Sequence, residues 1–196
     1  MAAMLLVAGS AFAQNYLNVG YGLPTLRYNY GEKLGTEKVD YNKFFAGYSH
    51  NFELASEFGL EAGLNFVFGL DKDKEKDLDA VVRNTSFLFE APVLANYTFV
   101  NESDIKFKAF AGPVFHCGLS DKTTSIVSGG KTWDIDNYKD GDLNRFNVSA
   151  AIAVAAEFSN RYRVKIGYDF GLTDVDKNDN IKLHENCISF TLGYIF

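Results

Sequence analysis

Large apolar residues alternate with small or polar residues along most of the chain from residue 14 onward. In the clearest stretch, 162–173, every second residue is apolar or aromatic, and Arg, Lys, Gly, Asp and Thr fill the positions between. A period of two residues is typical of a β-strand with one apolar face. The pattern recurs and predicts eight strands, at about 15–23, 41–52, 58–68, 87–99, 105–115, 146–158, 162–173 and 188–196.

The connections between these segments alternate strictly between short and long. Short ones fall near 51–57, 101–104 and 159–161, and long polar ones near 24–40, 70–84, 120–143 and 174–185. This is expected of an up-and-down antiparallel meander with its turns on one side of a membrane and its loops on the other. Such a meander would place the N- and C-termini on the turn side, which is the periplasmic side of an outer-membrane barrel.

The two faces of the strands differ in residue size as well as polarity. One face is almost uninterrupted Phe, Tyr, Leu, Ile and Val, whereas the other carries Gly, Ala and Ser beside a few charges. Small residues fit a narrow interior, and an apolar band with aromatic ends suits lipid. Backbone groups in lipid must be paired, so the sheet must close. The sequence therefore predicts an all-β fold, an eight-stranded antiparallel transmembrane β-barrel. A soluble, lipocalin-like barrel carrying an apolar ligand would show the reverse arrangement.

The length of 196 residues fits one domain, which we place at 14–196. The first thirteen residues, 1–13, are predicted to be a signal peptide, because an apolar run precedes an A-x-A cleavage site at 11–13. No Lys or Arg precedes Arg27, so we expect either that the start codon is placed too late or that the signal is truncated at its start. The net charge of −6 argues against nucleic acid as a partner.

Acidic and basic residues nearly balance on the face predicted to line the lumen. The acids are Glu61, Glu90, Glu157 and Asp169, and the bases are Lys106, Lys108, Arg145, Arg163 and Lys165. Eight strands leave an interior that side chains can fill, and buried charges must pair. We therefore expect a lumen filled by salt bridges. The alternative, a narrow or gated ion path, would need a continuous wet lumen.

The segment 174–185 carries oxygen ligands at the spacing of an EF-hand calcium loop. The residues at ligand positions are Asp174, Asp176, Asn178 and Glu185. The sixth position, where the loop needs Gly, is Asp179, and strands flank the segment. A solvated acidic loop is favoured over a calcium site, and the acidic segment 134–142 has weaker spacing still.

Two His/Cys pairs, His116 with Cys117 and His184 with Cys187, fall near strand ends. Zinc binds such residues. Neighbours on a strand point to opposite faces, however, and the two strands are not adjacent in a meander. No metal site is therefore expected. A Cys117–Cys187 disulfide stays open, because the compartment is oxidising.

No G-x-S-x-G, H-E-x-x-H or P-loop motif occurs. An outer-membrane enzyme would need a His near a Ser or Asp at the rim of the barrel. The residues available are Ser120, Asp174 and His184, and nothing in their spacing brings them together. We therefore assign no catalytic, cofactor-binding or metal-binding residue and expect no enzyme activity.

Several spaced motifs resemble the PorT-like outer-membrane β-barrel family. FEAPVL at 89–94 followed by YTF at 97–99 is similar to its E-x-P-L-L…Y-x-F strand, and FAGPVF at 110–115 resembles its A-G-P strand. The strand at 163–173 and the terminal FTLGYIF at 190–196 also fit, so the resemblance covers about 41–196. It implies an eight-stranded barrel in the outer membrane of a Gram-negative bacterium and brings no catalytic motif. Some members take part in protein secretion, a role that we do not transfer.

The expected function is that of a non-enzymatic integral outer-membrane protein. Its barrel would be a structural anchor, and its loops would meet the exterior or an unidentified protein partner; outer-membrane lipids surround it. The terminal residues Phe190, Leu192, Tyr194 and Phe196 alternate outward. They resemble the aromatic signal that the barrel-assembly machinery recognises. The alternatives are a soluble lipocalin-like carrier and an enzyme acting at the loop rim.

Overall fold

The computed structural model describes residues 14–29, 36–75, 80–102, 104–127, 131–141, 143–177 and 182–196. The predicted signal peptide at 1–13, and Asn178 and Asp179 of the acidic segment, lie outside the described residues. In the part of the chain that is described, no helix is long and apolar enough to cross a membrane.

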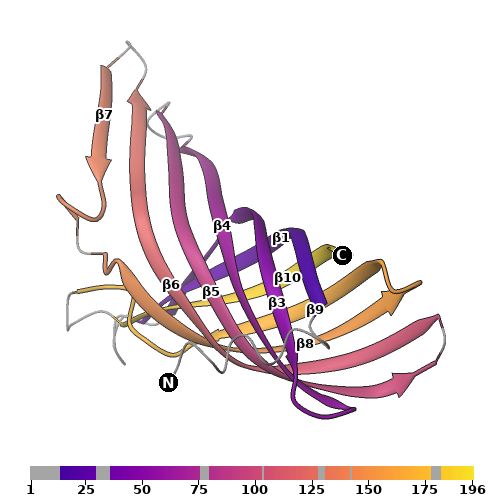
Figure 1. Ribbon diagram of the computed structural model, residues 1–196. Coiled ribbons are helices and arrows are strands. Elements are labelled where there is room, and N and C mark those ends of the chain that lie inside the picture. Colours follow the sequence, from indigo (N-terminus) through magenta and orange to yellow (C-terminus); the bar gives the residue numbers. More distant parts are fainter. Residues whose placement is uncertain are drawn as a thin grey trace, which may run out of the picture.

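An antiparallel sheet closes into a ring (Figure 1) in the order β1-β3-β4-β5-β6-β8-β9-β10, and β10 pairs back to β1. The ring strands are β1 (Gln14–Asn29), β3 (Asn42–Glu53), β4 (Phe58–Glu75), β5 (Ala80–Asn101), β6 (Ile105–Val127), β8 (Phe146–Phe158), β9 (Tyr162–Gly171) and β10 (Lys182–Ile195). Each ring strand after β1 pairs with the ring strand that precedes it in the chain. The predicted eight-stranded up-and-down antiparallel barrel is confirmed.

Two short strands lie off the ring. β2 (Thr36–Asp40) pairs with β1, and β7 (Lys131–Asp136) pairs with β6. Together with β7, the ends of β4, β5 and β6 rise well beyond the rest of the barrel (Figure 1). We call this extension, residues 71–75, 80–86, 121–127 and 131–136, the blade.

The blade corrects the predicted loops at 70–84 and 120–143, most of which are strand. The β4–β5 ladder continues from Leu70↔Thr85 to Glu75↔Ala80, and the β5–β6 ladder continues to Ala80↔Val127. Beyond an apolar environment both faces of a strand can be polar, so the alternation disappears while the hydrogen-bonded ladder continues. The hydrophobic pattern therefore underestimates the length of these strands.

Both ends of the described chain lie at the end of the barrel that carries the short hairpins. The amide of Phe196 donates to the carbonyl of Asn15 at 3.1 Å, so β1 begins where β10 ends. In the β8–β9 hairpin, Ser159 and Asn160 both have a φ of 51°, the left-handed conformation that a tight hairpin turn requires. We call this the turn end and the opposite end the loop end.

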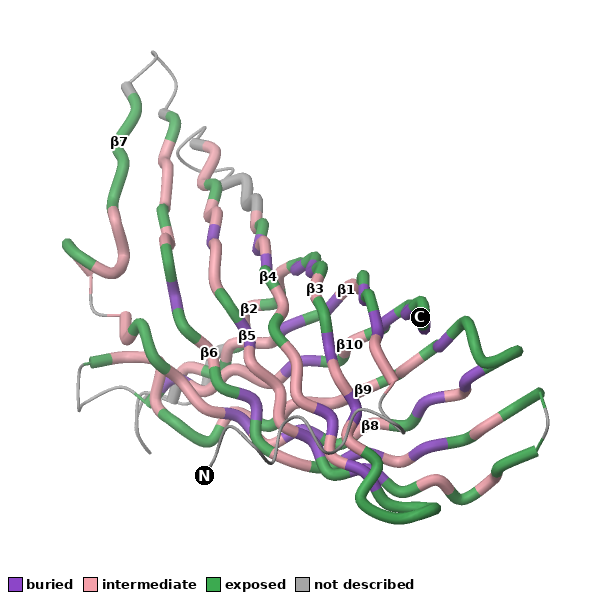
Figure 2. The backbone as a smooth tube through the Cα atoms, viewed as in Figure 1, coloured by how far each residue is buried: buried purple, intermediate pink, exposed green. Residues whose placement is uncertain are grey.

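Burial alternates along the ring strands, as Figure 2 shows. Residues of the predicted outer face are exposed, such as Val19 at 57% and Leu192 at 61%, whereas Arg163 at 1% and Glu61 at 2% are buried in the lumen. This confirms the predicted orientation of the two faces. One part of the interior is apolar: it contains Leu94, Phe110, Val114, Ala151 and Ala155. The sequence analysis did not anticipate this cluster.

Candidate functional site

Arg163 is the centre of one group of charges in the lumen, towards the turn end. Its guanidinium contacts both carboxylate oxygens of Glu61, and Nη2 also donates to Asn18 Oδ1 at 2.8 Å. Lys165 Nζ lies 3.2 Å from the same Glu61 carboxylate. The Arg163 Cζ lies 3.7 Å from the centre of the Tyr16 ring, so the cation also has an aromatic contact.

A second ion pair lies beside this group. Lys108 Nζ is 2.9 Å from Glu157 Oε2, and the hydroxyl of Tyr16 donates to Glu157 Oε1 at 2.8 Å. Side chains of Lys108 and Glu157 are 4% and 2% exposed, so each charge depends on the other for compensation.

A third group lies closer to the loop end. Lys43 Nζ is 2.6 Å from Glu90 Oε1, and His116 Nδ1 is 3.4 Å from the same oxygen. His116 Nε2 is hydrogen-bonded to Ser149 Oγ at 2.9 Å. The hydroxyl of Tyr41 donates to Glu185 at 2.7 Å. Glu90 is thus held by a base on each of two other strands.

The sequence analysis missed Lys43. The two-residue period could have placed it in the lumen. The inner positions of this strand are Lys43, Phe45, Gly47 and Ser49, and the outer positions between them are Phe44, Ala46 and Tyr48. Phe45 obscured this alternation, because it is a large apolar residue at an inner position, where small or polar residues were expected. Its ring covers Gly20. A Cβ added at Gly20 would lie 2.1 Å from that ring, so only glycine fits there.

Three predicted lumen charges lie apart from these ion pairs. Arg145 is exposed at the rim, where Nη1 donates to the carbonyls of Gly118 at 3.1 Å and Leu119 at 3.0 Å. Its assignment to the salt-bridged interior was therefore wrong: it precedes β8, outside the regular alternation. Lys106 lines a cavity of about 150 Å³ at the turn end. Asp169 lines a larger cavity at the loop end.

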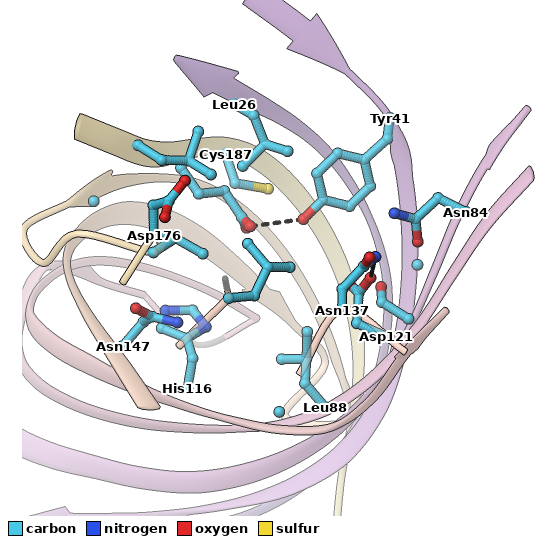
Figure 3. Close-up of a pocket in the computed structure, with 18 of the residues that line it drawn as sticks. Leu26, Tyr41, Asn84, Leu88, His116, Asp121, Asn137, Asn147, Asp176 and Cys187 are labelled. Atoms are coloured by element: carbon cyan, nitrogen blue, oxygen red, sulfur yellow. Dashed lines mark hydrogen bonds between the residues drawn. The ribbon is translucent and has the colours of Figure 1, made fainter. Parts of the chain in front are cut away.

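A cavity of about 390 Å³ lies at the loop end, above the Lys43–Glu90 pair. Figure 3 shows Leu26 and Tyr41 on one side of it, and Leu88, His116 and Asn147 on the other. Its other polar residues include Asn84, Asp121, Asn137, Asp176 and Glu185. Tyr138 packs over Gly118 and against Arg145, and burial together with the nearby Asp121 carboxylate raises the pKa of Tyr138 to about 12.

The residues considered for an enzyme do not converge. The β5–β6 register shifts between Phe87 and Leu88, which leaves Leu119 unpaired, and Ser120 does not line the cavity. Asp174 Oδ1 accepts from the amides of Asp176 at 3.1 Å and Leu183 at 2.9 Å. Neither Asp174 nor His184 lines the cavity.

The predicted metal and disulfide candidates are also separated. Cys117 is exposed and Cys187 is buried, both are free, and their strands β6 and β10 are not neighbours, so no disulfide joins them. Glu185 bonds to Tyr41, whereas Asp174 bonds to backbone amides. Among the described residues, no group of three or more His, Cys, Asp or Glu is placed to hold a metal ion.

A closed ring of strands with an apolar exterior and ion pairs inside defines a transmembrane β-barrel. The chain belongs to the outer membrane protein beta-barrel domain family, whose family model matches residues 12–177. It is an outer-membrane protein surrounded by lipid, and the soluble lipocalin-like alternative is set aside. The finer PorT-like assignment stays a prediction.

Solved structures of outer-membrane barrels are similar to this chain. Ail of Yersinia pestis, solved with the heparin analogue sucrose octasulfate, is 13% identical with a TM-score of 0.48, covering 94% of this chain and 99% of that chain. Neisserial surface protein A is 12% identical with a TM-score of 0.45, covering 93% and 97%. The outer membrane enzyme PagL is 14% identical with a TM-score of 0.36, covering 91% and 98%. No curated protein matches the chain in sequence.

Proposed function

We propose that the protein is a non-enzymatic outer-membrane anchor whose lumen is closed and whose blade and loops meet an external partner. The ion pairs that bridge the lumen carry this proposal. Glu61 contacts Arg163 and Lys165, Glu90 contacts Lys43, and Glu157 contacts Lys108. The apolar cluster around Phe110 fills part of the remaining space. An ion crossing the barrel would have to break these pairs.

Planar-bilayer recordings test the closed lumen. The wild-type protein should give no large, stable conductance steps. The double variant Lys108→Ser/Glu157→Ser removes both members of one buried ion pair, so that neither charge is left without its partner, and should give small, measurable steps. Arg161→Ser, at an exposed turn position, is the matched control and should stay silent. Large open steps from the wild-type barrel would refute the proposal.

The orientation of the barrel is part of the same proposal: the turn end faces the periplasm and the blade faces outward. Short turns are typical of the periplasmic side and longer connections of the outer side. An epitope inserted at 137–141 should be detected on intact cells. The same epitope at 54–57 should be detected only after permeabilisation. Detection at 54–57 on intact cells would reverse the orientation.

A further inference from the structure

The loop-end cavity carries more acidic than basic groups. The acidic residues that line it are Asp71, Asp121, Asp169, Asp176 and Glu185, whereas the basic ones are His116 and Arg145. Lys43, just below, is already shared between Glu90 and Glu185 at 2.6 and 3.9 Å. Acidic side chains therefore outnumber basic ones around the cavity.

Both bases of the cavity wall have hydrogen-bond or ion-pair partners outside the group of cavity carboxylates. Arg145 donates to two backbone carbonyls and lies over the Tyr138 ring, with 4.6 Å between the Arg145 Cζ and the ring centre. His116, on the cavity wall, is held between Ser149 and Glu90. Among the described residues, neither base forms an ion pair with a carboxylate that lines the cavity.

Asp169 provides the most direct contact for a ligand. It lies on β9 between the register partners Ala151 and Cys187, neither of which carries a charge. It borders both the loop-end cavity and the smaller space beneath it. Within the described residues its carboxylate has no hydrogen-bond or ion-pair partner, and the charged groups that act on it from a distance are Lys43, Glu90, His116 and Glu185. Asp121, across the cavity, accepts a hydrogen bond from Asn137 at 2.5 Å.

The remaining wall is apolar and aromatic. It includes Leu26, Val39, Leu88 and Leu183, together with the rings of Tyr28, Tyr41 and Tyr138. Apolar walls with a few placed polar groups are typical of small-molecule sites, and about 390 Å³ is within their usual size. Aromatic rings also attract organic cations through their faces.

We propose that the loop-end cavity binds a small organic cation with an apolar or aromatic body. The cationic nitrogen contacts the carboxylate of Asp169, and the body of the ligand packs against the leucines and tyrosines of the wall. This binding activity goes beyond the anchor function, and it does not require ions or ligand to cross the barrel.

The test compares three probes of nearly equal shape on the folded protein in nanodiscs of zwitterionic lipid. Tryptamine carries an ammonium group, indole-3-ethanol is neutral and indole-3-acetate is anionic. Calorimetry, corrected with empty nanodiscs, should show tryptamine binding about tenfold more tightly than indole-3-ethanol, because only tryptamine forms the ion pair. Indole-3-acetate should bind most weakly.

Two variants locate the ammonium site. Asp169→Asn should remove most of the preference for tryptamine and leave indole-3-ethanol binding unchanged. Asp121→Asn should lower the preference less, because Asn137 already bonds this carboxylate. Asp104→Asn, exposed at the turn end, is the matched control and should bind like wild type. A heat-dependent shift on electrophoresis shows that each variant is folded.

Equal binding of the three probes would overturn the proposal. A preference for indole-3-acetate would also overturn it, because the ligand would then pair with a base such as Arg145. A tryptamine preference that survives in folded Asp169→Asn and Asp121→Asn would overturn it too. Conductance of the wild-type barrel would refute the closed lumen but leave these binding results unaffected, so the two proposals fail separately.

Discussion

Arg163 on β9 and Glu61 on β4 join opposite walls of the barrel. The two strands are four places apart in either direction around the ring of eight, and the residues are 102 positions apart in sequence. Arg163 Nη2 lies 3.3 Å from Glu61 Oε1, beside a closer contact from Nη1, and both side chains are fully shielded from solvent. Because neighbouring strands do not bring these residues together, the pair depends on closure of the whole ring.

We predict that Arg163→Ala strongly destabilises the barrel. The substitution leaves Glu61 buried with Lys165 as its remaining ionic partner, and it removes donors to Asn18 and Ser49. Removing one partner of a buried ion pair typically costs about 3–5 kcal/mol. Urea unfolding in lipid vesicles measures the loss.

Arg161→Ala is the control for this experiment, since Arg161 is exposed in the turn at 159–161. It should change the free energy of unfolding by about 0.5 kcal/mol or less. Equal stability of Arg163→Ala and wild type would show that the buried pair contributes nothing to the fold.

A second prediction concerns the close approach of β5 and β6. A Cβ added at Gly112 would lie 2.3 Å from the carbonyl oxygen of Val93, so the backbone of one strand must move. Overpacking of this kind costs about 1–3 kcal/mol. Gly112→Ala should therefore lower the urea midpoint, whereas Ala111→Val, on the neighbouring outward position, should not. A Gly112→Ala barrel as stable as Ala111→Val would contradict this close packing.

Strict alternation predicted the ring strands and their outer face, because lipid-facing and lumen-facing residues obey a period of two. The prediction from alternation failed at positions where the two-residue period of apolar and polar side chains is interrupted. Arg145 precedes β8 and bonds to backbone carbonyls, and the blade continues by backbone pairing with polar residues on both faces. The cavity could not be predicted, since Asp169 and Asp121 converge only through ring closure and the turn that carries Asn137.

A third prediction concerns the pH dependence of stability at the loop end. Burial raises the pKa of the Asp121 carboxyl, although hydrogen bonds from Asn137 and Asn84 oppose the shift. The folded state therefore holds this proton more tightly than the unfolded chain, where the pKa is about 3.9. The resulting stability is present at low pH and is lost as the pH rises through the raised pKa.

Asp121→Asn cannot titrate, so it should be more stable than wild type at neutral pH, with a difference that shrinks as the pH falls towards about 4. Urea unfolding in lipid vesicles at several pH values measures this difference. Asp140→Asn, at an exposed position, controls for the loss of one charge. A difference that instead grows on acidification would reverse the direction of the Asp121 shift.

The last prediction concerns assembly through the closing strand, β10. Phe190, Leu192, Tyr194 and Phe196 are all exposed on its outer face, with Phe196 at 60%. We propose that this aromatic end is read by the barrel-assembly machinery, so that Phe196→Ala lowers the amount of assembled protein. The loss should exceed that caused by Phe66→Ala, a lipid-facing change of the same size at a side chain 45% exposed.

The heat-modifiable fraction in purified outer membranes measures assembly for both variants, and urea unfolding measures their stability. Phe66→Ala should cost at most about 3–5 kcal/mol and leave assembly intact. Phe196→Ala should reduce assembly even where the assembled fraction is as stable as Phe66→Ala. If both variants assemble in the same amount as wild type, Phe196 contributes only a lipid contact, and the proposed recognition of this residue is wrong.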